Sequence, residues 1–169
     1  MKNLKIYFTS DMHGYIYPTN YVDRSEKNIG LLNIMSNFKK DDNTLIIDCG
    51  DTIQGSPFTN YLSNNDFTTH PIADIMNAAG YDYITLGNHD FNYGRDIFSL
   101  FFKELGAQIL CANLEDKRGL LDIKKHIVLT DSTGLRVGFT GLVTDYVNVW
   151  ESKENIESFI VSDVKEAAE

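Results

Sequence analysis

The sequence has few cysteines and a shortage of basic residues. Two cysteines in 169 residues exclude a disulfide-rich miniprotein, and we expect Cys49 and Cys111, which lie in apolar runs, to be buried reduced thiols. Lys and Arg number 15 against 24 Asp and Glu, so the net charge is −9. An acidic protein repels phosphate polymers, which argues against binding to nucleic-acid polymers or anionic membranes.

Long apolar runs are also absent from the sequence. No segment approaches the ~18 consecutive apolar residues of a membrane helix, so we expect no membrane span. The first residues lead directly into a strand-like segment and show neither the apolar stretch nor the cleavage site of a signal peptide. Only 3 prolines are present, and 43% of the residues are hydrophobic, which is ordinary for one globular domain.

The hydrophobic pattern alternates between strands and helices. Strands are predicted over 4–9, 43–49, 83–86 and 107–112, and helices over 29–38, 71–79 and 95–105. The strand at 43–49 is apolar on both faces, which is typical of a buried parallel strand. In the helix at 95–105 we expect Ile97, Leu100, Phe101 and Leu105 to face inward. This alternation predicts an α/β layered fold.

The last third of the chain has a different pattern. Residues 124–130 and 135–140 flank the turn-like segment 131–134, which predicts a hairpin. A further strand is predicted over 157–161. Asp163 and Glu166 resemble a capping box that begins a short helix.

Three polar segments each follow a predicted strand. They are Ser10–Gly14, Gly50–Pro57 and Gly87–Gly94. Because the carboxyl ends of strands in α/β sheets converge on the ligand crevice, we expect their polar side chains to meet there. The candidate site residues in these segments are Asp11, His13, Asp51, Asn88 and His89.

These residue types suit a centre with two metal ions. Asp11 and His13 are two residues apart, so in extended backbone they would point to one side and grip one cation. Asp51 can bridge two metals, and Asn88 offers a neutral oxygen. Mixed carboxylate, imidazole and amide ligands favour Mn, Fe or Zn. Two such ions activate water for in-line attack on phosphorus, with His89 as a general acid at the leaving oxygen.

Each segment alone has a simpler explanation. An isolated Asp-x-His, Gly-Asp or Gly-Asn-His-Asp is typical of a turn or a helix cap. Three of them in order, each after a strand, favour the metal site. The other two histidines are not expected to be ligands, because His70 precedes a helix that it would cap and His126 lies in a predicted strand.

The three segments resemble those of the calcineurin-like metallophosphoesterases. More narrowly, they are similar to bacterial 5′-nucleotidases and 2′,3′-cyclic-nucleotide 2′-phosphodiesterase/3′-nucleotidases. The resemblance implies an αββα sandwich, with Asp11 and His13 on one of two divalent metals, Asp51 bridging both and Asn88 on the second. It places His89, the catalytic residue, at the leaving group of a nucleotide substrate.

Position 92 bears on the substrate. Many of the nucleotidases have an aspartate three residues after the catalytic histidine, and that aspartate orients it. Here the residue is Asn92, as in the cyclic-phosphodiesterase branch, which favours 2′,3′-cyclic nucleotides over the alternative, a 5′-nucleotidase.

The resemblance also implies parts that this sequence lacks. The family completes its metal site with a later Gly-His-x-His-like block and holds the base in a second domain, and nothing in 93–169 matches either. Residues 1–169 are therefore expected to be the N-terminal portion of a metallophosphoesterase domain. The alternatives are an inactive fragment that binds metal weakly and self-associates through an uncovered sheet face, or a one-domain phosphatase with a reduced site. Family members are often secreted or at the cell surface.

Overall fold

A parallel sheet forms the centre of the protein. The structure, a computed structural model, describes residues 3–130 and 133–169. Five strands pair in the order β1-β2-β3-β4-β6, and every pairing is parallel. These strands are β1 (Lys5–Thr9), β2 (Thr44–Asp48), β3 (Tyr83–Ile84), β4 (Gln108–Leu110) and β6 (Ile123–Lys124). The predicted α/β fold with parallel strands is confirmed.

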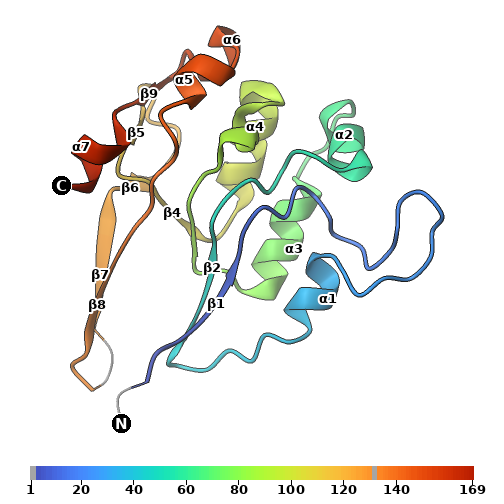
Figure 1. Cartoon of the computed structure of the whole chain (residues 1–169), viewed down its shortest axis with the longest axis horizontal. Coiled ribbons are helices and arrows are strands. Elements are labelled where there is room, and N and C mark those ends of the chain that lie inside the picture. Colours follow the sequence, from blue (N-terminus) through green and yellow to red (C-terminus); the bar gives the residue numbers. More distant parts are fainter. Residues whose placement is uncertain (1–2, 131–132) are drawn as a thin grey trace.

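Helices cover one side of this sheet (Figure 1). They are α1 (Leu31–Met35), α3 (Pro71–Ala79) and α4 (Gly94–Glu104). Helix α3 has the predicted bounds, because Pro71 suits the first helical position and Gly80 ends the helix in the left-handed conformation, with φ 77°. Helix α1 is shorter than predicted, and α2 (Pro57–Ser63), which begins after the capping residue Ser56, was not predicted.

The buried side of α4 agrees only in part with the prediction. Phe101 and Leu105 are buried as predicted, whereas Ile97 and Leu100 are only half-buried and Phe98 and Phe102 are buried instead. The reason lies in later chain segments. The Phe98 ring stacks 5.1 Å from that of Phe91 and packs 5.0 Å from that of Phe159. The buried face of α4 therefore includes side chains that contact distant segments, and the hydrophobic pattern of the helix alone does not show these contacts.

The opposite side of the sheet carries a hairpin. Strands β7 (His126–Thr130) and β8 (Arg136–Thr140) pair antiparallel, which confirms the predicted hairpin, and His126 is exposed. Of the predicted turn, Asp131 and Ser132 lie outside the described residues. The Phe139 ring of β8 stacks 6.2 Å from the Tyr83 ring of β3.

The C-terminal segment folds back toward the ends of α4 and β4. Strands β5 (Leu114–Asp116) and β9 (Phe159–Val161) pair antiparallel, and α5 (Val147–Trp150) and α6 (Lys153–Ile156) precede β9. The Asp163 side chain accepts the Glu166 N–H and starts α7 (Val164–Ala168), which confirms the predicted cap. Sequence patterns did not predict β5, α5 or α6.

Part of the hairpin side of the sheet is open. Phe8 is 72% and Ile6 is 42% exposed, and their neighbours Leu45 and Ile47 on β2 are only half-buried. The expectation that the second strand is buried on both faces is therefore wrong. Cys111 is buried as predicted, but Cys49 is exposed, because it follows the inward-facing Asp48 and so turns the other way; both thiols are free.

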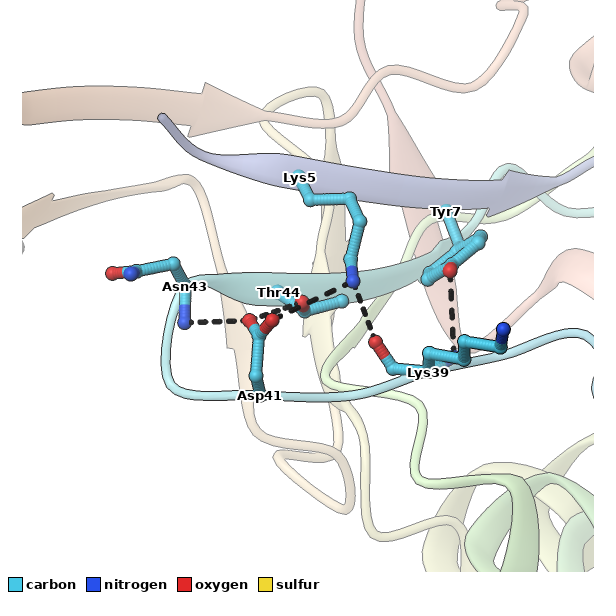
Figure 2. Close-up of polar contacts among 6 residues, drawn as sticks. All are labelled: Lys5, Tyr7, Lys39, Asp41, Asn43 and Thr44. Atoms are coloured by element: carbon cyan, nitrogen blue, oxygen red, sulfur yellow. Dashed lines mark hydrogen bonds and ion pairs between the residues drawn. The ribbon is translucent and has the colours of Figure 1, made fainter. Parts of the chain in front are cut away.

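Polar contacts fix the chain where β1 and β2 begin (Figure 2). The Lys5 ammonium donates to the Lys39 carbonyl at 2.7 Å and lies 3.6 Å from the Asp41 carboxylate. Asp41 accepts the Asn43 N–H at 3.0 Å and the Thr44 hydroxyl at 2.5 Å, and these hydrogen bonds lower its pKa. They hold the turn into β2 and so its register with β1.

The described helices do not include a candidate membrane span. Across residues 3–130 and 133–169, none is long and apolar enough to span a bilayer.

His70 stands at the N-cap of α3 but does not cap it through its side chain. The residue is 2% exposed and its ring packs 5.1 Å from that of Phe101, so it is a core side chain. The expected capping role is therefore wrong, since the ring turns inward. Burial lowers the pKa of His70 to about 4 from 6.5.

This burial predicts a pH-dependent stability. Because the folded-state pKa is depressed, the neutral ring contributes fully above pH ~6.5, and its contribution is lost as the pH falls toward 4, by roughly 3 kcal/mol. His70→Phe, which keeps a ring beside Phe101, should flatten this dependence. Urea unfolding at several pH values measures the difference between the two proteins. A difference that does not change across this range would contradict the prediction.

Candidate active site

The loops after β1 and β2 are joined by backbone hydrogen bonds. The Asp11 N–H donates to the Gly50 carbonyl at 3.0 Å, the His13 N–H to the Asp51 carbonyl at 2.8 Å, and the Gly14 N–H to Thr52 at 2.8 Å. The pairing of the two strands thus continues past their ends. As a result, two of the three polar segments lie side by side.

The loop after β3 packs directly against the loop after β2. A Cβ added to Gly50 would lie 2.1 Å from the Gly87 nitrogen, and one added to Gly87 would lie 2.0 Å from Asp51 Oδ1. Gly50 also has a φ of 91°, which other residues rarely adopt. Glycine at both positions is what allows the second and third loops to meet.

A buried carboxylate joins these two loops. Asp90 is 1% exposed and accepts four backbone N–H groups, from Asp51 at 3.0 Å, Thr52 at 2.8 Å, Ile53 at 3.2 Å and Gly87 at 2.9 Å. Burial raises the pKa of Asp90 to about 6, although the hydrogen bonds work against this shift. One side chain therefore satisfies the backbone of both loops.

A second buried acid supports the same region. Asp48, at the end of β2, accepts the Thr9 and Thr52 hydroxyls at 2.5 and 2.6 Å and the Gly50 N–H at 3.0 Å. Tyr81 lies 2.8 Å from the Thr9 hydroxyl. Burial raises the pKa of Asp48. This network fixes the ends of β1 and β2 beneath the loops.

Three predicted ligands come together at the surface of this scaffold. One ligand atom from each of Asp11, His13 and Asp51 lies within 4.8 Å of the others. Asp51 is 9% exposed and Asp11 is exposed. His13 Nδ1 lies 2.8 Å from the Gln54 carbonyl, which can only accept, so this nitrogen carries the proton and Nε2 is free to bind a ligand.

The sequence suggested an extended backbone at Asp11 and His13, and this expectation is wrong. Asp11, His13 and Asp51 have φ values of 53°, 47° and 55°, in the left-handed region that non-glycine residues seldom adopt. Each such residue costs about 1–3 kcal/mol and persists only where its surroundings impose it. Here the hydrogen bonds between the loops impose it, and the strain coincides with the donor group.

The other two predicted residues lie beside Asp51. Asn88 begins the 3₁₀ turn η1 (Asn88–Phe91), and the next residue, His89, donates its backbone N–H to Asp51 Oδ1 at 2.7 Å. The rings of His13 and His89 are 5.4 Å apart. Asn88 and His89 line a hollow of about 340 Å³ together with Asn92, Val147, Trp150 and Glu151.

Three residues that shape this region were not among the predicted site residues: Asp48, Asp90 and Glu151. Asp90 belongs to the Gly-Asn-His-Asp segment, and its place beside two candidate site residues was an available signal. Glu151 is 62 positions after His89, so no local pattern connects it with the site.

Comparisons with known proteins agree with this geometry. Residues 4–161 match the calcineurin-like phosphoesterase family. This chain belongs to that family.

Two curated relatives match nearly all of this calcineurin-like phosphoesterase chain. The trifunctional nucleotide phosphoesterase YfkN of Bacillus subtilis is 33% identical over 98% of the chain and 13% of its own length. The 2′,3′-cyclic-nucleotide 2′-phosphodiesterase/3′-nucleotidase of Salmonella typhimurium is 27% identical over 98% of the chain and 28% of its own length. The chain thus spans less than a third of either relative.

A solved structure has the same fold. A Staphylococcus aureus protein assigned as a 5′-nucleotidase superposes with a TM-score of 0.85 and 34% identity, over 96% of this chain and 33% of its own. The α/β fold of the described residues is therefore that of the metallophosphoesterases.

The donor group fits the divalent metals of the family. Two carboxylates and an imidazole with a free Nε2 are a mixed oxygen and nitrogen set, which suits Mn, Fe or Zn. Cysteine, the usual ligand of structural zinc, is not among the donors of this group.

Replacement of the Asp90 carboxylate should loosen the whole site. In Asp90→Asn the amide NH₂ would face backbone N–H groups, so hydrogen bonds to a charged acceptor are lost. The free energy of unfolding should therefore fall by at least ~2 kcal/mol above pH 7. Denaturant unfolding measures the change. Asp96→Asn, on the exposed surface of α4, is the matched control and should lie within ~0.5 kcal/mol of wild type. Equal stabilities of the two variants would contradict the role of Asp90.

Proposed function

We propose that this chain is the N-terminal portion of a catalytic domain that hydrolyses phosphoesters of nucleotides with two divalent metals. The observation that carries the proposal is the donor group of Asp11, His13 and Asp51 on strained backbone at the carboxyl ends of β1 and β2. Relatives with nucleotide phosphoesterase names support the substrate class.

In this proposal each residue has a separate role. Asp11 and His13 would hold one metal, Asp51 would supply oxygens to both and Asn88 would hold the second. Bound metals would polarise the phosphoryl oxygens and lower the pKa of an attacking water. His89, whose backbone N–H is bonded to Asp51, lines the hollow where the leaving group would lie. Its Nδ1 is bonded to Asn92, so the proton for the leaving oxygen would come from Nε2 once that nitrogen is also protonated.

Asn92 favours the cyclic substrate. Its Oδ1 lies 2.7 Å from His89 Nδ1, so an amide rather than a carboxylate contacts the catalytic histidine. On the resemblance stated above, this amide is typical of the 2′,3′-cyclic-nucleotide 2′-phosphodiesterase/3′-nucleotidase branch. The alternative is a 5′-nucleotidase, and several relatives carry that name.

Self-association is a separate part of the proposal. Phe8 and Ile6 expose apolar surface on the open side of the sheet, and a second copy could cover it. Light scattering of the 169-residue chain distinguishes a monomer from a dimer.

The function is tested in a longer protein that carries this chain. Asp51→Asn should lower the hydrolysis of 2′,3′-cyclic AMP by more than 100-fold, beyond the ~10–100-fold typical of residues that only orient a metal ligand. Initial rates with 2′,3′-cyclic AMP and 5′-AMP measure both the loss and the substrate preference. Asp96→Asn serves as the control and should keep wild-type rates. Near-normal rates in Asp51→Asn would overturn the metal assignment, and a preference for 5′-AMP would favour the nucleotidase alternative.

A further inference from the structure

A line of hydrogen bonds connects His89 to the C-terminal part of the chain. His89 Nδ1 lies 2.7 Å from Asn92 Oδ1, and Asn92 Nδ2 donates to Glu151 Oε2 at 2.6 Å. Asn92 directly follows the 3₁₀ turn of the third loop, whereas Glu151 directly follows α5. All three residues line the same hollow.

The chemistry of these groups fixes the direction of each bond. A carboxylate only accepts hydrogen bonds, so the NH₂ of Asn92 must face Glu151 and its oxygen must face His89. A carbonyl oxygen also only accepts, so Nδ1 of His89 must carry the ring proton. The reversed amide would place two acceptors 2.6 Å apart.

Glu151 is itself held in place. Its other oxygen, Oε1, accepts the Ser152 N–H at 2.6 Å and Asn155 Nδ2 at 3.0 Å. Asn155 Nδ2 also lies 3.4 Å from the Asn92 carbonyl. Both carboxylate oxygens therefore have donors, and the side chain is half-buried against the third loop.

We propose that Glu151 is a positioning residue that sets the tautomer of His89 through Asn92. With the proton on Nδ1, Nε2 is the ring nitrogen available to a molecule in the hollow that His89 lines. The consequence for catalysis rests on the proposed function, in which His89 acts at the leaving group. The tautomer itself is a property of this chain alone.

Glu151→Gln tests the proposal with almost no change in shape. Its single carbonyl oxygen is best placed toward the two donors, Ser152 N–H and Asn155 Nδ2, which turns its NH₂ toward Asn92. Asn92 must then reverse its amide and present NH₂ to His89 Nδ1. We expect the ring proton to move from Nδ1 to Nε2.

The measurement is a long-range ¹H–¹⁵N NMR correlation of the imidazole rings in the metal-free chain. Spectra are recorded with EDTA at about pH 8, above the ordinary histidine pKa of ~6.5. The signals of His89 are assigned by their loss in His89→Gln. Wild type should show the Nδ1–H tautomer, and Glu151→Gln should show Nε2–H.

Two further variants keep the result unambiguous. Glu154→Gln removes an equal charge from an exposed position on α6 and should leave the tautomer unchanged. Asn92→Ala removes the connecting amide, so it should abolish the preference for Nδ1–H, and adding Glu151→Gln to it should change nothing more. This variant decides the question if Glu151→Gln does not fold.

The proposal is overturned by an Nε2–H tautomer in wild type, by no change in Glu151→Gln, or by an equal change in Glu154→Gln. Because no metal or substrate is present, the result is independent of activity. A protein that hydrolyses nucleotides but shows no switch would refute only the role of Glu151. A switch in an inactive protein would refute only the proposed function.

Discussion

The Asp90 carboxylate is the group on which the candidate site depends. Its two oxygens accept backbone N–H groups from the loops after β2 and β3, and the residue is almost completely buried. Burying a carboxylate costs free energy unless the carboxylate accepts hydrogen bonds. The N–H groups that Asp90 needs come from both loops, so this requirement keeps the two loops in one arrangement. The backbone N–H of Asp51 donates to the Asp90 carboxylate. This contact keeps Asp51 in its strained backbone conformation, with its own carboxylate directed toward Asp11 and His13.

Much of this arrangement was predictable from the sequence because it depends on local patterns. Proline at the start and glycine at the end defined α3, and the rule that strand ends converge brought Asp11, Asp51 and His89 to one edge. The burial of Phe98 was not predictable, since it depends on the distant Phe159. Cys49 was misjudged because an apolar run does not reveal which face of a sheet is covered. The roles of Asp90 and Glu151 depend on contacts between segments far apart in the chain.

The candidate site is built from two separate parts of the chain. Its donor group lies on loops joined by backbone hydrogen bonds, whereas the wall of the hollow beside His89 comes from α5 and the residue after it, where Trp150 is 64% exposed. Asn92, which contacts the His89 ring, carries no charge. The first carboxylate along this line of hydrogen bonds is that of Glu151, which contacts Asn92 and not His89 itself. On the proposals made above, the residue that acts at the leaving group is thus oriented by a segment that the three loop motifs do not include.

The proposed metal centre requires that Asp11, His13 and Asp51 hold a divalent cation. Anomalous diffraction from crystals of the 169-residue chain soaked in Mn²⁺ tests it most directly, because it locates the metal without reference to activity. We expect a strong anomalous peak within bonding distance of both carboxylates and of Nε2 of His13. Saturating Mn²⁺ that produces no peak at this group, or a peak only among other residues, would contradict it.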